Sequence, residues 1–437
     1  MRMGKLTRLA TALALGALML AGCDDDSNIV TNSGVTSTPR SAAVAPKAAI
    51  TAPVTTNESE SSLSSSFKDV SGPVLLDRTD AQVIQTLPIF NHPQSCTASA
   101  DGKFLFVTNS GMIVSSVQGP SVEYYKGAIS KLEIDADGRL KVVKLKFVDG
   151  LHAPMGISVL PKGTGKFPAG SLFVSTGMTA GLDDKGEHIT DIQKFNPGVS
   201  IFDPNTGGQL GFIPMGPGRA VPKSISSRYT VLAPSGLCFD SASDLYVADA
   251  GNTGKDLEPP VIGRPGILRI RHQFIDMYAD NKTNEKDRSS AVAFTSERHE
   301  PAAVFYCKID DFIYWTTSDG KPPLVGGVYR VSRENFSVRT PENILGGVEG
   351  ALMGVTITTN ENLVASQIDG QLKYMISGQK VQGEVPFEDS GLFSSPGDIK
   401  LIPSSKGYNV LYVPEQEPNS VEQWKQRLRV VVLPKGM

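Results

Sequence analysis

Residues 233–252 read APSGLCFDSASDLYVADAGN. Two short apolar runs, Gly236–Phe239 and Leu245–Ala248, lie on either side of a stretch of small and acidic residues, 240–244. This pattern is typical of two antiparallel strands joined by a tight turn. Pro234 suits the first residue of a strand, because proline cannot donate a hydrogen bond to a neighbouring strand. The stretch therefore predicts a β-hairpin.

Relatives of this hairpin recur along the chain. They are SCTASADGKFLFVTNSG (95–111), MGISVLPKGTGKFPAGSLFVSTG (155–177), AVFYCKIDDFIYWTTSDG (303–320), MGVTITTNENLVASQIDG (353–370) and GDIKLIPSSKGYNVLYVPEQ (397–416). Most copies are followed by a third strand, as in GAISKLEID (127–135), GVSIFD (198–203), GILRIR (266–271), GGVYRVS (326–332) and LRVVVLP (428–434). Self-similar antiparallel units at a spacing of roughly 50 to 70 residues indicate a β-propeller, whose circular closure leaves only short sheet edges.

The ends of the chain predict how the ring closes. The sixth unit has three clear strands, and AQVIQTL (81–87) precedes the first unit without a partner of its own. We expect 81–87 to be the outer strand of the last blade, because one blade cannot bury both faces of its sheet alone. The predicted fold is all-β, a six-bladed β-propeller of four-stranded antiparallel blades over residues 67–437.

The motif PSGLCFD…DLYVADAGN resembles the NHL repeat and the gluconolactonase-like (SMP-30-like) six-bladed propellers, and the resemblance covers roughly residues 73–437. It implies the fold, while function depends on sites placed on the fold. The gluconolactonase-like family holds a divalent cation with a Glu at one strand start and an Asn and an Asp at others. The corresponding positions here carry Ser235-Gly236 and Met155-Gly156, and only Asp398 and Glu349 are carboxylates nearby. This departure counts against lactonase activity.

The first residues predict export. Arg2, Lys5 and Arg8 precede the apolar stretch Leu9–Ala21, which ends in Leu20-Ala21-Gly22-Cys23. A basic start, a short apolar region and small residues before a cleavage site describe a signal peptide over 1–22. The tetrapeptide resembles a bacterial lipobox, which implies lipidation (palmitate) at Cys23 and a membrane anchor facing the periplasm. By the same resemblance, Asp24 after the cysteine favours the inner membrane.

Residues 23–66 are rich in Ser, Thr, Ala and Pro and bury too little apolar surface to fold. They predict a disordered tether between the lipidated Cys23 and the propeller. The 437 residues carry a formal net charge of -3, which argues against a nucleic-acid partner. We expect a monomer that contacts the membrane through its anchor and an unknown protein or small-molecule ligand through its propeller.

Three cysteines follow Cys23, namely Cys96, Cys238 and Cys307. An odd number in an exported protein cannot pair completely. We interpret them as small buried residues of strands, and a Cys238–Cys307 disulfide between neighbouring inner strands is the alternative.

Recognition is expected at one end of the ring axis. In such propellers this axial mouth is lined by the starts of the inner strands and by the loops that leave the second strands. Those loops (109–127, 177–198, 249–266, 317–327 and 415–427) are long, and long loops on a rigid scaffold often carry binding sites. The candidate residues at the mouth are Asn109, Asp249, Asn252, Asp319, Asp369, Asp398 and Glu415. The acidic side chains of these loops either are simply solvated or form a rim that attracts a cation or basic ligand.

Three histidines stand shortly before prolines at predicted strand starts, in Asn91-His92-Pro93, His152-Ala153-Pro154 and His299-Glu300-Pro301. By the repeat they occupy equivalent positions in three blades, and three imidazoles would suit zinc with an open position for water. Some lyases on this propeller resemble that arrangement. The alternative is that they are ordinary loop histidines.

Two functions from different classes remain open at this point. The first is a membrane-anchored binding or scaffold module that uses the axial mouth. The second is a metal-dependent hydrolase or lyase, lactonase-like or zinc lyase-like, with one divalent ion (Zn or Ca) at that mouth. The sequence establishes no cofactor and leaves open whether the protein is an enzyme.

Overall fold

The computed structural model of the chain describes residues 80–115, 119–123, 126–177, 181–182, 197–216, 231–251, 265–280, 292–296, 300–318, 325–336, 341–376, 382–385, 393–416, 426–434 and 436–437. The predicted signal peptide (1–22) and the predicted tether, with Cys23 and Asp24, lie outside these residues. No helix in the described part is both long and apolar enough to cross a membrane.

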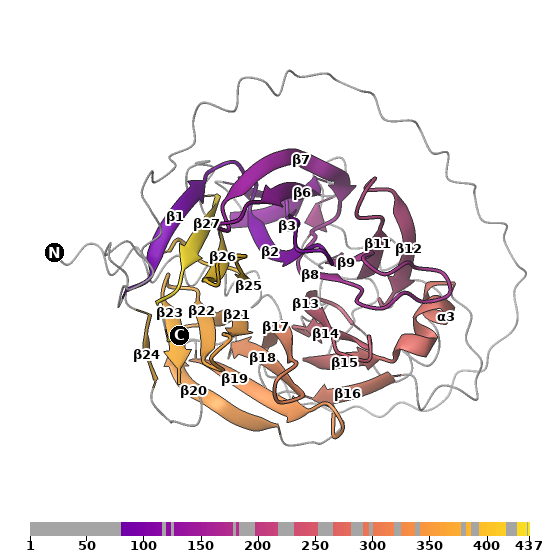
Figure 1. Cartoon of the computed structure of the whole chain (residues 1–437). Coiled ribbons are helices and arrows are strands. Elements are labelled where there is room, and N and C mark those ends of the chain that lie inside the picture. Colours follow the sequence, from indigo (N-terminus) through magenta and orange to yellow (C-terminus); the bar gives the residue numbers. More distant parts are fainter. Residues whose placement is uncertain are drawn as a thin grey trace, which may run out of the picture. The chain divides into compact units, whose positions relative to one another are not determined.

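The chain folds as a six-bladed β-propeller, with six four-stranded sheets arranged around one axis in the described residues (Figure 1). Blade 1 contains β2 (Pro93–Ala98), β3 (Phe104–Asn109), β6 (Gly127–Ile134) and β7 (Leu140–Leu151). Blade 2 contains β8 (Ile157–Val159), β9 (Leu172–Thr176), β11 (Gly198–Phe202) and β12 (Gln209–Pro214). Blade 3 contains β13 (Pro234–Phe239), β14 (Leu245–Asp249), β15 (Gly266–Ile270) and β16 (Val292–Ser296).

The second half of the ring repeats this order. Blade 4 contains β17 (Glu300–Cys307), β18 (Phe312–Ser318), β19 (Val325–Ser332) and β20 (Glu342–Glu349). Blade 5 contains β21 (Leu352–Ile357), β22 (Leu363–Gln367), β23 (Leu372–Met375) and β24 (Gln382–Glu384). Blade 6 contains β25 (Lys400–Pro403), β26 (Asn409–Glu415) and β27 (Arg427–Val432), followed by a strand from the other end of the chain.

That last strand is β1 (Gln82–Leu87), which pairs antiparallel with β27 and completes the sheet order β1-β27-β26-β25. The predicted closure of the ring is therefore confirmed. Gln85 joins β1 to blade 1 as well: its Nε2 donates to the Leu140 carbonyl at 2.9 Å, and its Oε1 accepts from the Leu140 N–H at 2.7 Å. The Tyr412 hydroxyl of blade 6 donates to the Gly138 carbonyl at 2.9 Å across the same seam.

The stretch that opened the sequence analysis forms β13 and β14, as predicted. Asp240 organises their turn, because its Oδ1 accepts the N–H groups of Ala242 and Asp244, each at 2.9 Å. Ser243 takes a positive φ of 65° in this turn. All residues of both strands are buried, since each side of this sheet packs against a neighbouring blade.

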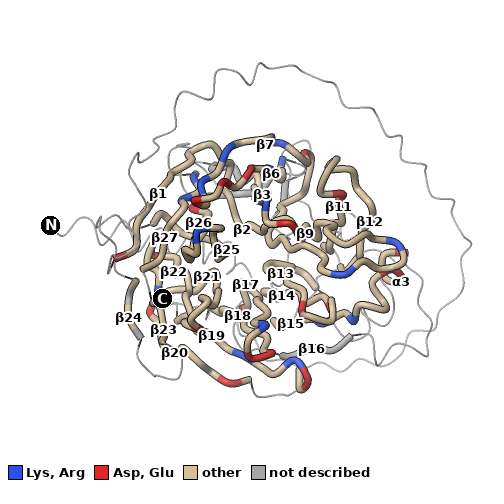
Figure 2. The backbone as a smooth tube through the Cα atoms, viewed as in Figure 1, with Lys and Arg blue, Asp and Glu red and all other residues tan. Residues whose placement is uncertain are grey.

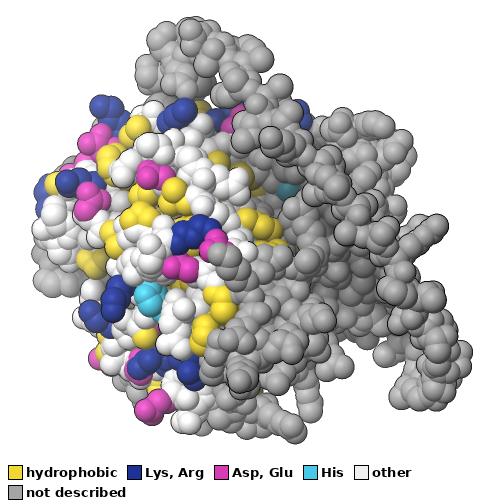
Figure 3. All heavy atoms as spheres, turned by 90° about the vertical axis from the view of Figure 1, so that its right-hand side faces the viewer, with side chains coloured by type: hydrophobic (Ala, Val, Ile, Leu, Met, Phe, Trp, Pro, Cys, Tyr) yellow, Lys and Arg dark blue, Asp and Glu magenta, His cyan; other side chains and the backbone are white. Residues whose placement is uncertain are grey.

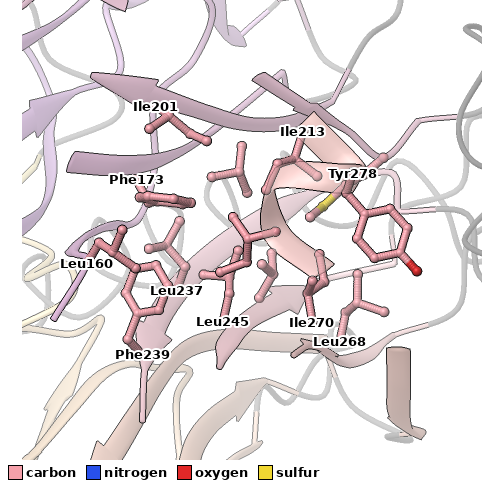
Figure 4. Close-up of a cluster of buried hydrophobic side chains, with 14 of the residues drawn as sticks. Leu160, Phe173, Ile201, Ile213, Leu237, Phe239, Leu245, Leu268, Ile270 and Tyr278 are labelled. Carbon is pink, nitrogen blue, oxygen red and sulfur yellow. The ribbon is translucent and has the colours of Figure 1, made fainter. Parts of the chain in front are cut away.

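The core lies between blades. The largest of its clusters joins blades 2 and 3 and includes Phe173, Ile201, Leu237, Leu245 and Tyr278 (Figure 4). Tyr278 comes from a feature that the sequence did not predict, the short helix α3 (Ile275–Ala279) that follows the 3-10 turn η2 (His272–Phe274). A second unpredicted element is a three-stranded sheet of β4 (Met112–Ser115), β5 (Gly119–Glu123) and β10 (Gly181–Leu182), which joins the loops of blades 1 and 2.

The inner strands approach one another closely around the axis. A Cβ on Gly236 would lie 2.6 Å from the Ala303 Cα of the next blade, and one on Gly397 would lie 2.3 Å from the Gln94 carbonyl oxygen. Hydroxyl groups join neighbouring blades at this level: Ser366 Oγ donates to the Gly397 carbonyl at 2.7 Å, and Ser235 Oγ donates to that of Pro301 at 3.1 Å. Small residues at the third position of motifs such as Pro234-Ser235-Gly236 are therefore required by the ring.

The cysteines Cys96, Cys238 and Cys307 are all free and buried, as the primary interpretation predicts. The alternative Cys238–Cys307 disulfide is wrong. Cys238 packs in the cluster between blades 3 and 4, whereas Cys307 packs in the cluster between blades 4 and 5. The two thiols therefore lie on opposite faces of the blade 4 sheet.

Charged residues are dispersed over the described surface. Figure 2 shows them mainly in the turns and outer strands, while the inner strands are mostly uncharged. In the view from the right-hand side of Figure 1, basic and acidic side chains alternate with neutral ones on the described part of the face (Figure 3). No single-sign patch dominates that part of the face.

Candidate functional site

The axial mouth is the end of the axis at which the inner strands begin and the second strands end. In most blades the last residue of the second strand lies opposite the first residues of the inner strand and carries a polar side chain. These residues are Asn109, Asp249, Gln367 and Glu415; in blade 4 the buried polar residue is Thr317, the last but one of β18, which lies opposite Pro301, and all five are buried. The repeat therefore places a ring of polar groups around the mouth.

Several members of this ring hold the chain segment that enters their own blade. Asn109 Oδ1 accepts the Asn91 N–H at 3.3 Å. Asp249 accepts the N–H groups of Ala233 at 2.9 Å and Gly251 at 3.0 Å. Burial raises the pKa of Asp249 to about 6, although these backbone donors favour its charged form. The contacts give both side chains a structural role.

Glu415 has a similar role in blade 6. Its Oε2 accepts the Ser394 N–H at 2.7 Å and the guanidinium of Arg427 at 3.0 Å, and its Oε1 lies 2.6 Å from Arg429 Nε. The side chain is 0% exposed. Glu415 is therefore a buried ion-paired residue, whereas the sequence suggested that it belonged to a solvated acidic rim.

Glu300 differs from these residues because the described structure gives it no partner. It is the first residue of β17 and is 8% exposed, and its Oε2 makes no hydrogen bond. Burial alone raises its pKa from 4.5 to about 7. The axial mouth therefore contains a buried carboxyl group whose pKa is about 7 and whose Oε2 has no hydrogen-bond partner among the described residues.

Gln367 offers a second unused acceptor in the neighbouring blade. Its Nε2 donates to the Glu349 carbonyl and to Asp369 Oδ2, the latter at 3.0 Å. Both partners accept hydrogen bonds only, so they fix the orientation of the amide. Gln367 Oε1 is buried without a partner, whereas Asp369 is exposed to solvent.

Asp398 lies deeper along the axis than the mouth. Ser95 Oγ donates to its Oδ2 at 2.8 Å, and its N–H donates to the Gln94 carbonyl at 2.9 Å. Burial raises the pKa of Asp398 to about 7, against the opposing effects of Ser95 and Lys400. Asp398 thus joins blade 6 to blade 1, and its carboxyl is not part of the ring at the mouth.

His92 and His152 both lie where the chain enters its blade. The His92 carbonyl accepts the Ser110 N–H at 3.0 Å and the His152 carbonyl accepts the Gly177 N–H at 2.9 Å, in each case from the residue that follows the second strand. His92, with φ 53°, directly precedes Pro93, whereas Ala153, with φ 42°, stands between His152 and Pro154. Both rings are buried, and His92 Nε2 lies 3.4 Å from Gln426 Nε2.

A metal centre does not fit the described residues, because they include no group of three His, Cys, Asp or Glu side chains that could hold an ion. His299, Asn252 and Asp319 lie outside the described residues, as do most of the long second-strand loops with their acidic side chains. His92 and His152, two members of the predicted three-histidine site, lie in the described structure, and the site stays a prediction because His299 lies outside it.

Sequence reasoning missed Glu300 and Gln367 as site residues. Glu300 could have been found, because it is an acidic residue at a strand start just before a proline, within the His299-Glu300-Pro301 motif itself. Gln367 gives no such signal, since only the structure shows which of its amide atoms is already in use.

Comparison with known proteins finds similar chains among solved structures. No protein-family model and no curated protein sequence matches the chain at a significant level. Among solved structures, a gluconolactonase from Xanthomonas campestris has a TM-score of 0.49 and 11% identity, covering 84% of this chain and 100% of that one. A catalytically inactive virginiamycin B lyase from Staphylococcus aureus, solved with quinupristin, has a TM-score of 0.41 and 13% identity over 81% of this chain and 100% of that one. At these scores and identities the likeness carries no argument about activity.

Proposed function

We propose that this protein is a ligand-binding module of the bacterial cell envelope that binds its ligand at the axial mouth. The observation that carries the proposal is the buried carboxyl of Glu300, whose Oε2 has no hydrogen-bond partner. Leaving a buried acceptor unsatisfied costs about 1–3 kcal/mol, and a bound donor removes that cost. The comparable groups of Asp249 and Glu415 are satisfied by the chain itself, so Glu300 is the one suited to an external partner.

The rigid ring supports binding at this position. Close backbone contacts between inner strands, such as Gly236 against Ala303, and the hydroxyl contacts between blades fix the strand starts relative to one another. A site built on such a scaffold needs little ordering when a ligand arrives, and this lowers the entropic cost of binding.

The membrane anchor is part of the same proposal. The signal peptide and the Leu20-Ala21-Gly22-Cys23 motif support lipidation of Cys23, and Asp24 supports retention at the inner membrane, facing the periplasm. A flexible tether over 24–66 would span on the order of 35 Å, which keeps the propeller mouth clear of the lipid headgroups.

A spin-label experiment tests the location of binding. Asp369 is exposed at the mouth, and Lys308 is exposed at the far end of β17, so Asp369→Cys and Lys308→Cys give matched labelling sites. The native thiols Cys96, Cys238 and Cys307 are all buried, and burial raises the pKa of each, so they should not compete for the label. In a fragment screen by ligand-observed NMR, binders should be broadened by a label at 369 and unaffected by one at 308. The opposite pattern would contradict the proposal.

The alternative, a metal-dependent hydrolase or lyase, makes a different prediction. The purified protein would then retain about one Zn or Ca ion per chain after exhaustive dialysis. The binding module needs no such ion, and metal analysis therefore separates the two functions. Stoichiometric metal would favour the enzyme.

A further inference from the structure

Two unused acceptors flank one apolar cluster at the mouth. The cluster is made by Ala302 of blade 4 together with Ala351, Met353 and Ile368 of blade 5, all buried. Glu300 stands two residues before Ala302 on β17, and Gln367 directly precedes Ile368. The Ile368 N–H donates to the Ala351 carbonyl at 2.9 Å, which ties the exit from β22 to the start of β21.

The two polar atoms without a partner beside this cluster have the same hydrogen-bonding character. Glu300 Oε2 and Gln367 Oε1 are both hydrogen-bond acceptors without a partner. Glu300 also receives no electrostatic contribution from a charged neighbour, because burial is the only cause of its pKa shift. A ligand that fits must therefore donate hydrogen bonds, and a positive charge gains most beside a buried carboxylate.

The apolar cluster restricts the ligand further. Ala302, Met353 and Ile368 offer hydrocarbon surface, which favours a carbon body over a hydrated inorganic ion. A polyhydroxy ligand such as a sugar would need donors as well as acceptors around it, and the described residues at the cluster offer only the two acceptors.

We propose that the mouth between blades 4 and 5 binds an organic ammonium group with an apolar body, accepted by Glu300 and Gln367 and packed against the Ala302–Met353–Ile368 surface. This inference rests on the proposed binding function and names its ligand class. Glu300 supplies the charge, Gln367 supplies a second acceptor, and the cluster selects for the size of the hydrocarbon part.

The proposal sets a pH dependence. With the pKa of Glu300 at about 7, the carboxyl is mostly ionised at pH 8 and mostly neutral at pH 6, so ammonium binding should weaken about tenfold across that interval. The neighbouring strands β14 and β20 end in Asp249 and Glu349, and Asp369 lies two residues after the end of β22. The first is occupied by backbone donors, and the other two are exposed and leave the pKa of Glu300 unchanged. His299, next to Glu300 in sequence, is outside the described residues.

Titration of the purified protein with n-butylammonium, followed by NMR or calorimetry at pH 8 and pH 6, tests the inference. 1-Butanol is the uncharged isostere, and tetramethylammonium is a cation without N–H donors. We expect n-butylammonium to bind at least tenfold more tightly than either. Glu300→Gln keeps the shape and removes the charge, and it should weaken binding at least tenfold. Glu349→Gln, an exposed carboxyl at the same mouth, is the matched control and should change binding less than twofold.

The following results would overturn the inference. Equal binding of 1-butanol would show that charge plays no part, and equal losses in Glu300→Gln and Glu349→Gln would show unspecific acidic attraction. Tight binding of Ca or Zn that Glu300→Gln abolishes would identify a metal site instead. Mouth binders that carry no ammonium, found by the label at 369, would refute this inference and leave the proposed function standing. Binders located only by the label at 308 would refute both.

Discussion

The closing strand β1 provides the most demanding test of the fold. Leu87→Ala truncates a side chain that is 1% exposed in the strand that completes blade 6. Truncating a buried leucine costs about 2–5 kcal/mol, from lost burial and from the cavity left behind. At an unfolding entropy of about 2.1 cal/mol/K per residue, a domain of this size loses roughly 1.4 °C of Tm per kcal/mol, so the variant should melt about 3–7 °C lower.

Deletion of all residues up to and including Phe90 removes β1 completely and should destabilise the protein more than Leu87→Ala does. Ile84, Leu87 and Phe90 are each 1% exposed, and burying each such side chain contributes about 1.5–3 kcal/mol. Gln85 also loses its two hydrogen bonds to Leu140, each contributing about 1 kcal/mol. The total of roughly 6–11 kcal/mol is comparable to the whole stability of an ordinary domain, so this deletion should leave the ring open and prone to aggregation.

The assay compares the melting and urea unfolding of three proteins: the chain from residue 67, the chain from residue 91, and the chain from residue 67 with Leu87→Ala. Loss of residues 24–66 should leave the melting temperature within about 1 °C of that of the full mature chain, because this segment buries little surface. If the chain from residue 91 melts cooperatively at the same temperature as the chain from residue 67, then β1 does not close the ring and the reasoning fails.

Further predictions concern the axis, the mouth and the anchor. Gly236→Ala should destabilise the protein by about 1–3 kcal/mol in urea unfolding, because its Cβ would meet Ala303 Cα at 2.6 Å, while Gly208→Ala, with only a hydroxyl at 3.3 Å, should have a much smaller effect. Since burial raises the pKa of Glu300 above its unfolded value, the wild type should lose about 3 kcal/mol of stability as the pH rises from about 4.5 to about 7. Glu300→Gln should abolish most of that loss, and identical pH profiles would disprove the assignment. Cys23→Ser should release the protein from membranes or leave it unprocessed, and a processed variant that still partitions into detergent would refute lipid anchoring.

The fold could be predicted from the sequence because the residue types of the hairpin pattern are determined by local packing and turn geometry. Apolar strands, turn residues such as Asp240 and the glycine at position 236 are all fixed by local packing, so they recur visibly in each copy. Closure by 81–87 followed from counting strands. The helix α3 could not be predicted, because its residues Ile275 and Tyr278 are selected by the surface between blades 2 and 3 and not by a helical repeat.

The site was less accessible to sequence reasoning. Histidine beside proline is visible in the sequence, but the burial of the His92 and His152 side chains is visible only in the structure. Carboxylates at the mouth look alike in sequence, yet Asp249 and Glu415 are occupied by the chain while Glu300 is not. Whether a carboxylate is hydrogen-bonded by the chain itself depends on which backbone N–H groups and guanidinium groups lie near it. Those groups come from segments that are far apart along the chain.

The pairing of Gln82 with Val432 has a consequence for the biogenesis of the protein. Strand β1 can pair with β27 only after almost all of the residues between the two strands have been synthesised. A sheet with such a long sequence separation forms slowly, since the loop between its strands must close first. If the chain is exported as proposed, the ring cannot close until β27 (Arg427–Val432) has crossed the membrane, and the strand order of blade 6 would then link the completion of folding to the completion of export.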